Sequence, residues 1–194
     1  MSHEQVQAVS VDEIVGDLAQ ECALLAASYV DTIREIAAGD NAAAAIPMGL
    51  LAVSQVLVMG ARLGAIEDIV PADQFESDPG PEVDLAPLLE SLRAQFDGLD
   101  DYTDVVDPVT STEVTGGSLS GDLTDVAACL LHGLQHHRAG RHSEALWWWQ
   151  FSYLSQWGVR ASMALRVLQT LLAHVRLDAD DDLVAEAQFE ALHP

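Results

Sequence analysis

All four tryptophans of the chain lie within residues 141–175, a run that no proline interrupts. Gly158 is the only glycine after Gly140, so the run predicts one helix of about nine turns. Apolar residues recur along it at alternating spacings of four and three, which indicates a packed seam. The seam consists of Trp147, Phe151, Leu154, Gly158, Ala161, Leu165, Leu168, Leu172 and Val175. An adjoining stripe carries Trp149, Tyr153, Trp157, Val167 and Leu171. We therefore predict that this helix is the centre of a bundle.

The length of 194 residues suits one domain, with a core over residues 10–177 and an acidic tail or short acidic helix over 178–194. The net charge is −23, and the cationic residues are eight arginines without a lysine. A surface with this charge repels nucleic acids and anionic lipids, so we expect no direct nucleic-acid binding.

The two cysteines, Cys22 and Cys129, each fall in a helical apolar pattern and form no CxxC pair. With no secretion signal at the N-terminus, the sequence predicts reduced thiols and a cytoplasmic protein. Residues 41–61 are uncharged and long enough to span a bilayer, but Pro47 and Gly49 interrupt them. No basic cluster or aromatic belt flanks the run, so a buried bundle helix without membrane contact is expected.

Apolar periodicity predicts further helices over residues 11–39, 41–64, 85–96 and 118–137, the last running antiparallel to the tryptophan helix. The core face expected for the helix over 118–137 consists of Leu123, Val126, Ala127, Leu130, Leu131 and Leu134. Residues 67–125 hold sixteen acidic side chains against one arginine and read as a long acidic connector, with one extended piece at 113–115. The fold class is therefore an all-α, single-domain bundle of about five main helices. The arginines of residues 126–177 are expected to hold the connector down.

One stripe of the 118–137 helix carries side chains that bind transition metals. Asp125, Cys129, His132 and His136 follow one another at spacings of four, three and four, and Asp122 precedes them by about a turn. Carboxylate and imidazole groups on one face suggest a divalent transition-metal site made of Asp122, Asp125, His132 and His136. A further ligand would come from another element. The alternative is a helix whose acids complement its dipole and whose histidines edge the core.

Successive helical residues point about 100 degrees apart, so three consecutive tryptophans cannot share one core. Trp148 falls on a mostly polar side, where it is either covered by the connector or offered to a partner. The predicted interaction surface comprises Trp148, Trp149, Tyr153, Trp157 and Arg160. A pocket for an anionic ligand beside Arg160 is a further alternative.

Several short motifs resemble the bacterial domain-of-unknown-function family numbered 5063, over roughly residues 10–176. They are Asp107-Pro108, Ser118-Leu119, Asp122-Leu-Thr-Asp125, Gly133-Leu134, Ala145-Leu-Trp, Phe151-Ser and Trp157-Gly158. The resemblance implies a small, cytoplasmic, mainly helical domain without an established activity. It also implies histidines on both sides of the Trp-Gly pair, where this chain has Gln156 and Arg160. A site that used those histidines would lack ligands here.

The sequence contains no phosphate loop, nucleophile elbow or recognisable acid–base pair. The leading functional hypothesis is a non-catalytic interaction or regulatory module without a cofactor, whose partner is another protein or a second copy of itself. The alternative is a metal- or anion-binding domain, with hydrolytic activity, that uses the acidic and histidine stripe.

Overall fold

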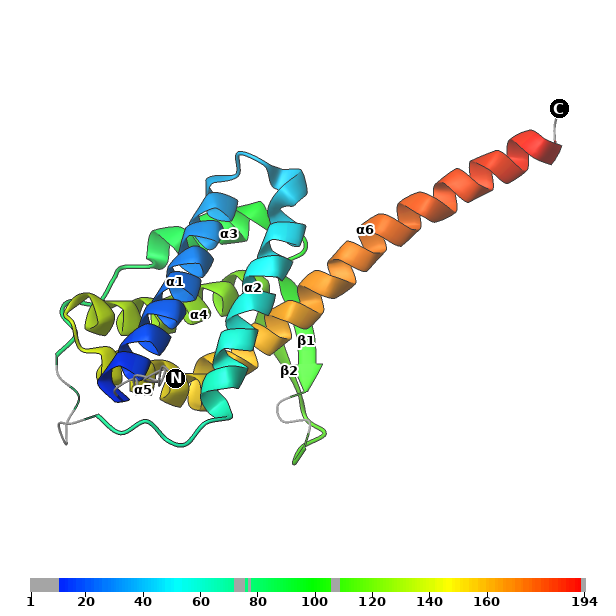
Figure 1. Ribbon diagram of the computed structural model, residues 1–194. Helices are drawn as coiled ribbons and strands as arrows, with labels where there is room; N and C mark the ends of the chain where they lie inside the picture. Colours follow the sequence, from blue (N-terminus) through cyan, green and yellow to red (C-terminus); the bar gives the residue numbers. More distant parts are fainter. Residues whose placement is uncertain (1–10, 72–75, 77, 106–108, 193–194) are drawn as a thin grey trace, which may run out of the picture.

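The computed structural model describes residues 11–71, 76, 78–105 and 109–192, with side chains described for residues 14–177 of these. The described chain is an all-α bundle with a small two-stranded sheet, as expected (Figure 1). In chain order the described elements are α1 Val11–Ala38, α2 Ala42–Gly64, α3 Ala86–Gln95, β1 Asp101–Val105, β2 Val114–Ser118, α4 Leu119–Arg138, α5 His142–Ser152, the π-helical turn η1 Tyr153–Trp157, and α6 Gly158–Leu192.

Helices α1 and α2 form a hairpin that covers α4 and the start of α6 (Figure 1). Gly39 ends α1 with a φ of 76°, a left-handed conformation that glycine adopts without steric cost. The buried Tyr29 hydroxyl donates to the carbonyl oxygen of Leu123 at 3.0 Å, which fixes α1 against α4. At Gly60 of α2, an added Cβ would lie 2.3 Å from the Tyr153 ring, so the missing side chain lets α2 approach η1 closely.

Among the described residues, α2 is the one helix long and apolar enough to cross a membrane by length and composition. Its buried side includes Val53, Val56, Met59 and Leu63 and faces the bundle. A core helix passes the same length and composition test. In this fold α2 packs mainly against α1 and α6.

The acidic connector contains one more strand than the sequence predicts. β1 pairs antiparallel with β2, with Asp101 opposite Ser118 and Val105 opposite Val114. The expected extended piece at 113–115 overlaps β2, whereas β1 was missed because it carries two aspartates, which strands disfavour. Helix α3 agrees closely with the predicted range of 85–96.

Helix α4 begins at a Ser118 cap, whose side-chain oxygen accepts from the amide of Gly121 at 3.2 Å. Its predicted core face is buried throughout and consists of Leu123, Val126, Ala127, Leu130, Leu131 and Leu134. A tight turn at Gly140 then leads into α5. The following chain is helical from His142 to Leu192, as predicted for its first part, but η1 interrupts the α-helical hydrogen bonding.

The predicted seam of the tryptophan helix is wrong in its N-terminal half. Phe151 and Leu154 are exposed, and at the other end Val175 is exposed as well. A π turn holds one more residue than an α turn, so it rotates the inward face along the helix. The seam members Gly158, Ala161 and Leu168 are buried as predicted, and Trp149 and Trp157 of the adjoining stripe are buried with Ala164.

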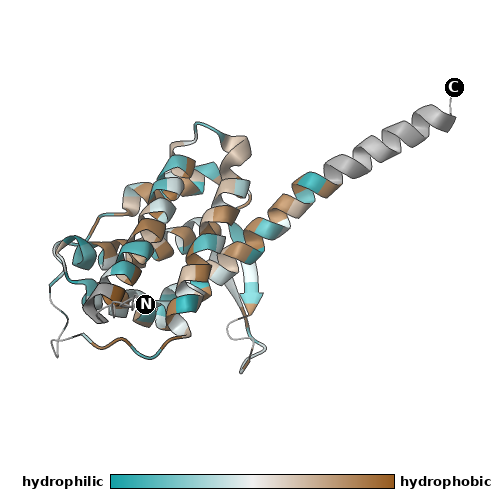
Figure 2. Cartoon of the chain, in the orientation of Figure 1, coloured by the Kyte–Doolittle hydropathy of each residue, from teal (hydrophilic) through white to brown (hydrophobic). Residues whose placement is uncertain are grey.

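Helix α6 extends well beyond the bundle (Figure 1). Figure 2 shows both hydrophobic and hydrophilic residues on the coloured part of this extension, next to the bundle. The expected break after Leu177 does not occur, since the helix continues to Leu192. Aspartate lowers helix propensity by well under ~1 kcal/mol per residue, and no glycine or proline lies in this stretch to end the helix.

Candidate functional site

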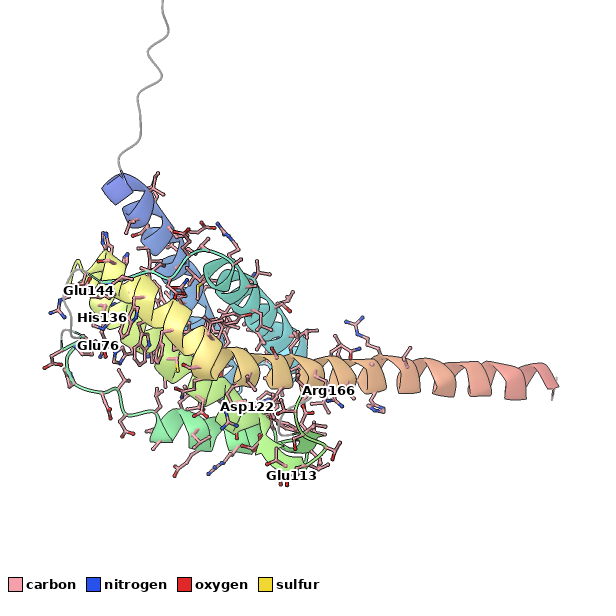
Figure 3. All side chains as sticks on the ribbon, turned by 90° about the horizontal axis from the view of Figure 1, so that it is seen from below. Glu76, Glu113, Asp122, His136, Glu144 and Arg166 are labelled. Atoms are coloured by element: carbon pink, nitrogen blue, oxygen red, sulfur yellow. The ribbon has the colours of Figure 1, made fainter. Side chains whose placement is uncertain are left out.

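The four predicted metal ligands of α4 fall into two separate groups. Fourteen residues separate Asp122 from His136, which corresponds to about 21 Å along a helix. Figure 3 shows Asp122 and His136 well apart along the molecule. The prediction that Asp122, Asp125, His132 and His136 bind one ion is therefore wrong, because a shared helical face does not bring distant turns within ligating distance.

The two aspartates share one arginine as an ion-pair partner. Arg160 Nη1 donates to Asp122 Oδ1 at 3.2 Å, and its Nε lies 3.6 Å from Asp125 Oδ2. The Tyr102 hydroxyl donates to Asp122 Oδ2. Burial raises the pKa of Asp122 above its ordinary value, although the hydrogen bond from Tyr102 and the charge of Arg160 oppose the rise.

This ion-pair network bears on two predictions from the sequence, a metal site at the aspartates and an anion pocket beside Arg160. The guanidinium of Arg160 lies near both carboxylates and supplies a positive charge where a metal cation would otherwise bind. The same ion pairs occupy the positive charge of Arg160, which the predicted pocket for an anionic ligand would need. The resemblance described above implies a histidine at position 160, where this chain carries an arginine that pairs with both aspartates.

The two histidines converge on a carboxylate from the connector. His132 Nε2 lies 2.5 Å and His136 Nε2 2.9 Å from the same oxygen, Oε1 of Glu76. Burial raises the pKa of Glu76, but hydrogen bonds from both histidines outweigh it, and the pKa falls below its ordinary value. His136 is fully buried, whereas His132 and Glu76 are partly exposed. We call this group the Glu-His-His cluster.

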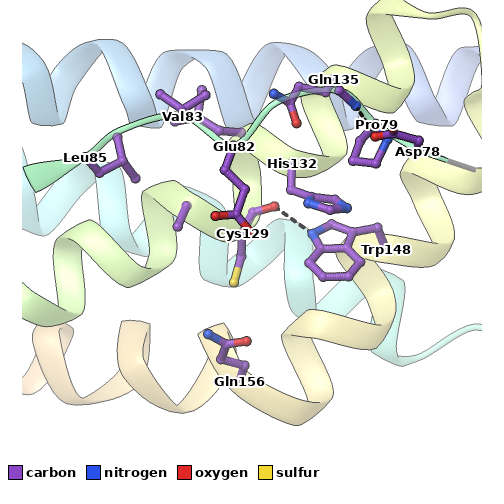
Figure 4. A pocket seen from close by; sticks show the side chains of 13 residues that line it. Asp78, Pro79, Glu82, Val83, Leu85, Cys129, His132, Gln135, Trp148 and Gln156 are labelled. Atoms are coloured by element: carbon purple, nitrogen blue, oxygen red, sulfur yellow. Dashed lines mark hydrogen bonds between the residues drawn. The ribbon is translucent and has the colours of Figure 1, made fainter. Parts of the chain in front are cut away.

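Trp148 lies beside the cluster and lines a pocket together with the connector. Its ring stacks on His132 with centroids 3.8 Å apart, and its Nε1 donates to the carbonyl oxygen of Cys129 at 2.9 Å (Figure 4). These two side chains form part of the wall of a pocket of about 560 Å³ between α4, α5 and the connector. The connector contributes to its lining Asp78, Pro79, Gly80, Glu82, Val83 and Leu85. Trp148 is half-buried, and it faces the same pocket as these connector residues.

Three other members of the predicted interaction surface do not form an exposed surface. Trp149 and Trp157 are both 0% exposed, so neither can contact a partner from the surface of this chain. Their indole nitrogens donate within the core, to the carbonyl oxygens of Leu130 and Trp149 respectively. Tyr153 is partly buried and packs on Trp157. These residues were misassigned because the π turn rotates their stripe toward α2 and α4.

The arginines of the C-terminal half fasten the connector, as expected. Arg141 donates to the carbonyl oxygen of Asp78 at 2.9 Å, and Arg166 pairs with Asp104 at 2.8 Å. Gln135 adds a hydrogen bond to the carbonyl oxygen of Pro81 at 2.9 Å. The connector is thus attached to α4, α5 and α6 at several points.

An apolar surface lies where the sequence predicted core. Phe151 is 51%, Leu154 61% and Val159 58% exposed, on neighbouring turns of α5, η1 and α6. Trp147 stacks on Phe151 at 5.7 Å, and Leu154 and Val159 border a groove of about 530 Å³ that also contains Met163 and Val105. We call Trp147, Phe151, Leu154, Val159 and Met163 the apolar stripe.

Two residues of these sites, Glu76 and Tyr102, were not predicted from the sequence. Glu76 is one of sixteen acids in residues 67–125, and nothing in its local pattern sets it apart. Tyr102 lies on the strand that was missed, so its contact with Asp122 could not be anticipated. A further group from another element was expected beside the histidines, and Glu76 of the connector lies at that place.

A family model described as a domain of unknown function, DUF5063, matches residues 13–174. A crystal structure of protein BF1032 from Bacteroides fragilis resembles the fold with a TM-score of 0.62 and 15% sequence identity, covering 78% of this chain and 89% of that one. At this identity the likeness concerns the fold alone. No curated protein matches the chain at a significant level.

Proposed function

Because this chain belongs to the DUF5063 family, whose description assigns no function, we propose from its own surface that it is a non-catalytic protein-interaction module. The observation that carries the proposal is the apolar stripe. Three of its side chains are more than half exposed on consecutive turns of one helix. Contiguous apolar surface rimmed by polar groups is typical of docking sites.

The surroundings of the stripe support the same function. Its groove is bordered by the ion pair between Asp104 and Arg166, so an apolar centre has a polar rim. Trp147 and Phe151 supply rigid aromatic area, which interfaces use preferentially. Asp104 and Arg166, the charged residues beside the stripe, already pair with each other. A partner would therefore gain affinity mainly by burying the apolar side chains.

The charge of the protein defines the partner. Two copies that each carry −23 repel one another, whereas a basic protein is attracted to a chain of this net charge. The proposed partner is therefore a basic, cytoplasmic protein that places an apolar surface on the stripe. A homodimer is the competing arrangement.

A matched pair of variants tests the stripe. The variant Leu154→Ser/Val159→Ser replaces two side chains of the stripe that are 61% and 58% exposed. The control Leu51→Ser/Val58→Ser replaces two side chains of α2 that are 64% and 61% exposed. Immobilised wild type and both variants are exposed to a lysate, and the retained proteins are identified and purified. We expect a basic protein to bind the wild type and the α2 control at least ~10-fold more tightly than the stripe variant.

The proposal fails if the identified partner binds all three proteins equally or binds the α2 control as weakly as the stripe variant. Light scattering of the purified protein tests the homodimer. A dimer that the stripe substitutions dissociate would replace the basic partner with a second copy. Raising the salt concentration should weaken the proposed heteromeric complex, since its charge attraction is screened.

A further inference from the structure

We infer that the Glu-His-His cluster is a binding site for a divalent transition-metal ion, with Glu76, His132 and His136 as its three protein ligands. The ligand atoms of these residues all lie within 4.8 Å of one another. Imidazole nitrogen with one carboxylate oxygen suits Zn²⁺, Co²⁺, Ni²⁺ or Fe²⁺ rather than Ca²⁺ or Mg²⁺. This site is separate from the apolar stripe, so the inference does not depend on the interaction function.

The local structure pre-arranges the ligands. His132 and His136 are four residues apart on α4 and therefore lie on one face of the helix, one turn apart. The stack of Trp148 on His132 holds one imidazole, and complete burial holds the other. Ligands of a tetrahedral ion lie roughly 3.3 Å apart, given metal–ligand distances of about 2.0–2.1 Å. The observed 2.5 and 2.9 Å separations need to open by less than about 1 Å to admit one.

Charge also favours a cation at this point. The partly exposed Glu76 carboxylate is contacted by two imidazoles and, among the described residues, by no arginine. This differs from Asp122, whose negative charge Arg160 already balances. Once both Nε2 atoms have lost their protons, each can donate its lone pair to a metal ion. The same ion would balance the negative charge of Glu76.

Three protein ligands leave a position for water or a further ligand, as in open zinc sites. His132 belongs both to the ligand set and to the wall of the 560 Å³ pocket, so a molecule in the pocket would contact a metal-bound imidazole. Glu76 comes from the connector and the histidines from α4, so the ion would also join these two elements. His136 Nδ1 has no hydrogen-bond partner among the described residues, so packing and the Nε2 contact with Glu76 orient that ring.

Cobalt titration of the chelator-stripped protein tests the site. Co²⁺ should bind at one equivalent, give visible absorption bands of a low-coordinate site, and be displaced by one equivalent of Zn²⁺. Glu76→Gln and His132→Ala should each weaken binding at least ~10-fold, because each removes one of three protein ligands. Glu82→Gln, an acid of the same connector, and His142→Ala, a histidine outside the cluster, are the matched controls and should bind as the wild type does.

The outcomes separate a metal site from a hydrogen-bonded clamp. If the wild type takes up no more Co²⁺ than Glu76→Gln, the three residues only fasten the connector and the inference is overturned. If the controls lose as much affinity as Glu76→Gln, the acidic surface binds ions nonspecifically and the inference fails too. Circular dichroism checks that every variant is folded. Quenching of indole emission by Co²⁺ that disappears in Trp148→Phe would place the ion beside Trp148.

Discussion

The backbone amide of Gly158 donates its hydrogen bond to the carbonyl oxygen of Tyr153, five residues earlier. This is the π-helical hydrogen bond, and it turns the inward face of the long helix between α5 and α6. Trp149 before the turn, Trp157 at its last position and Ala161 after it are all buried. The same rotation leaves Phe151 and Leu154 on the outside. The hydrogen bond therefore sets both the core and the apolar stripe.

Substitution of Gly158 by alanine should destabilise the protein. A Cβ there would lie 2.4 Å from the carbonyl oxygen of Tyr153 and 2.8 Å from its ring, so the backbone of the π turn must shift. We expect a loss of about 2–4 kcal/mol in the free energy of unfolding, measured by urea denaturation. Gly116→Ala is the control, because its Cβ would meet no atom within 4 Å. Equal stabilities of the two variants would show that the turn tolerates a side chain.

Truncations on the two sides of this helix should have opposite outcomes. Trp157→Ala removes a fully buried indole and should cost about 3–5 kcal/mol of unfolding free energy. Leu154→Ala removes a side chain that is 61% exposed and should cost less than about 1 kcal/mol. Thermal and urea unfolding measure both. A large loss for Leu154→Ala would mean that the apolar stripe belongs to the core and is not available to a partner.

The sequence predicts the helices well because their periodicity and end signals are local. Gly39 and Ser118 bound helices as expected, and the core face of α4 is buried as predicted. The π turn also left a trace in the sequence. Trp149, Tyr153, Trp157 and Ala161 are spaced by four throughout, which exceeds the α-helical repeat of 3.6 and fits a locally wider turn.

The candidate sites depend on contacts that periodicity does not encode. The histidine pair on α4 was visible as a spacing, but its carboxylate comes from a residue 56 positions away from His132. Arg160 could be identified as a cation, yet its pairing with Asp122 required knowing how α6 crosses α4. Sequence patterns therefore locate candidate groups on elements, while the packing of the elements decides which groups meet.

The two cysteines should be unreactive in the folded protein. Burial, reinforced by neighbouring acidic charge, raises the pKa of Cys22 to about 12 and that of Cys129 to about 11. Compared with an ordinary thiol of pKa 9.0, the thiolate fraction of Cys129 at pH 8 falls about 100-fold. Labelling with a thiol-exchange reagent should be slow in buffer and should reach two thiols per chain in denaturant. Rapid native labelling of either cysteine would contradict its burial.

Asp122 should make the stability of the protein depend on pH in an unusual direction. Burial raises the pKa of this carboxyl above 3.8 in the folded protein, so the folded state retains the proton in a range where the unfolded chain has lost it. The contribution of Asp122 to the free energy of unfolding therefore decreases as the pH rises from 3.8 through the folded-state pKa. Above the folded-state pKa this contribution is constant.

The variant Asp122→Asn isolates this contribution, because the other acidic groups titrate in both proteins. The stability of the wild type minus that of the variant should decrease as the pH rises across the acidic range and then level off, measured by urea unfolding at a series of pH values. Arg160 retains Asp125 as a partner in the variant, so the fold should persist at neutral pH. A difference that increases with pH would mean that Arg160 and Tyr102 stabilise the carboxylate more than burial disfavours it.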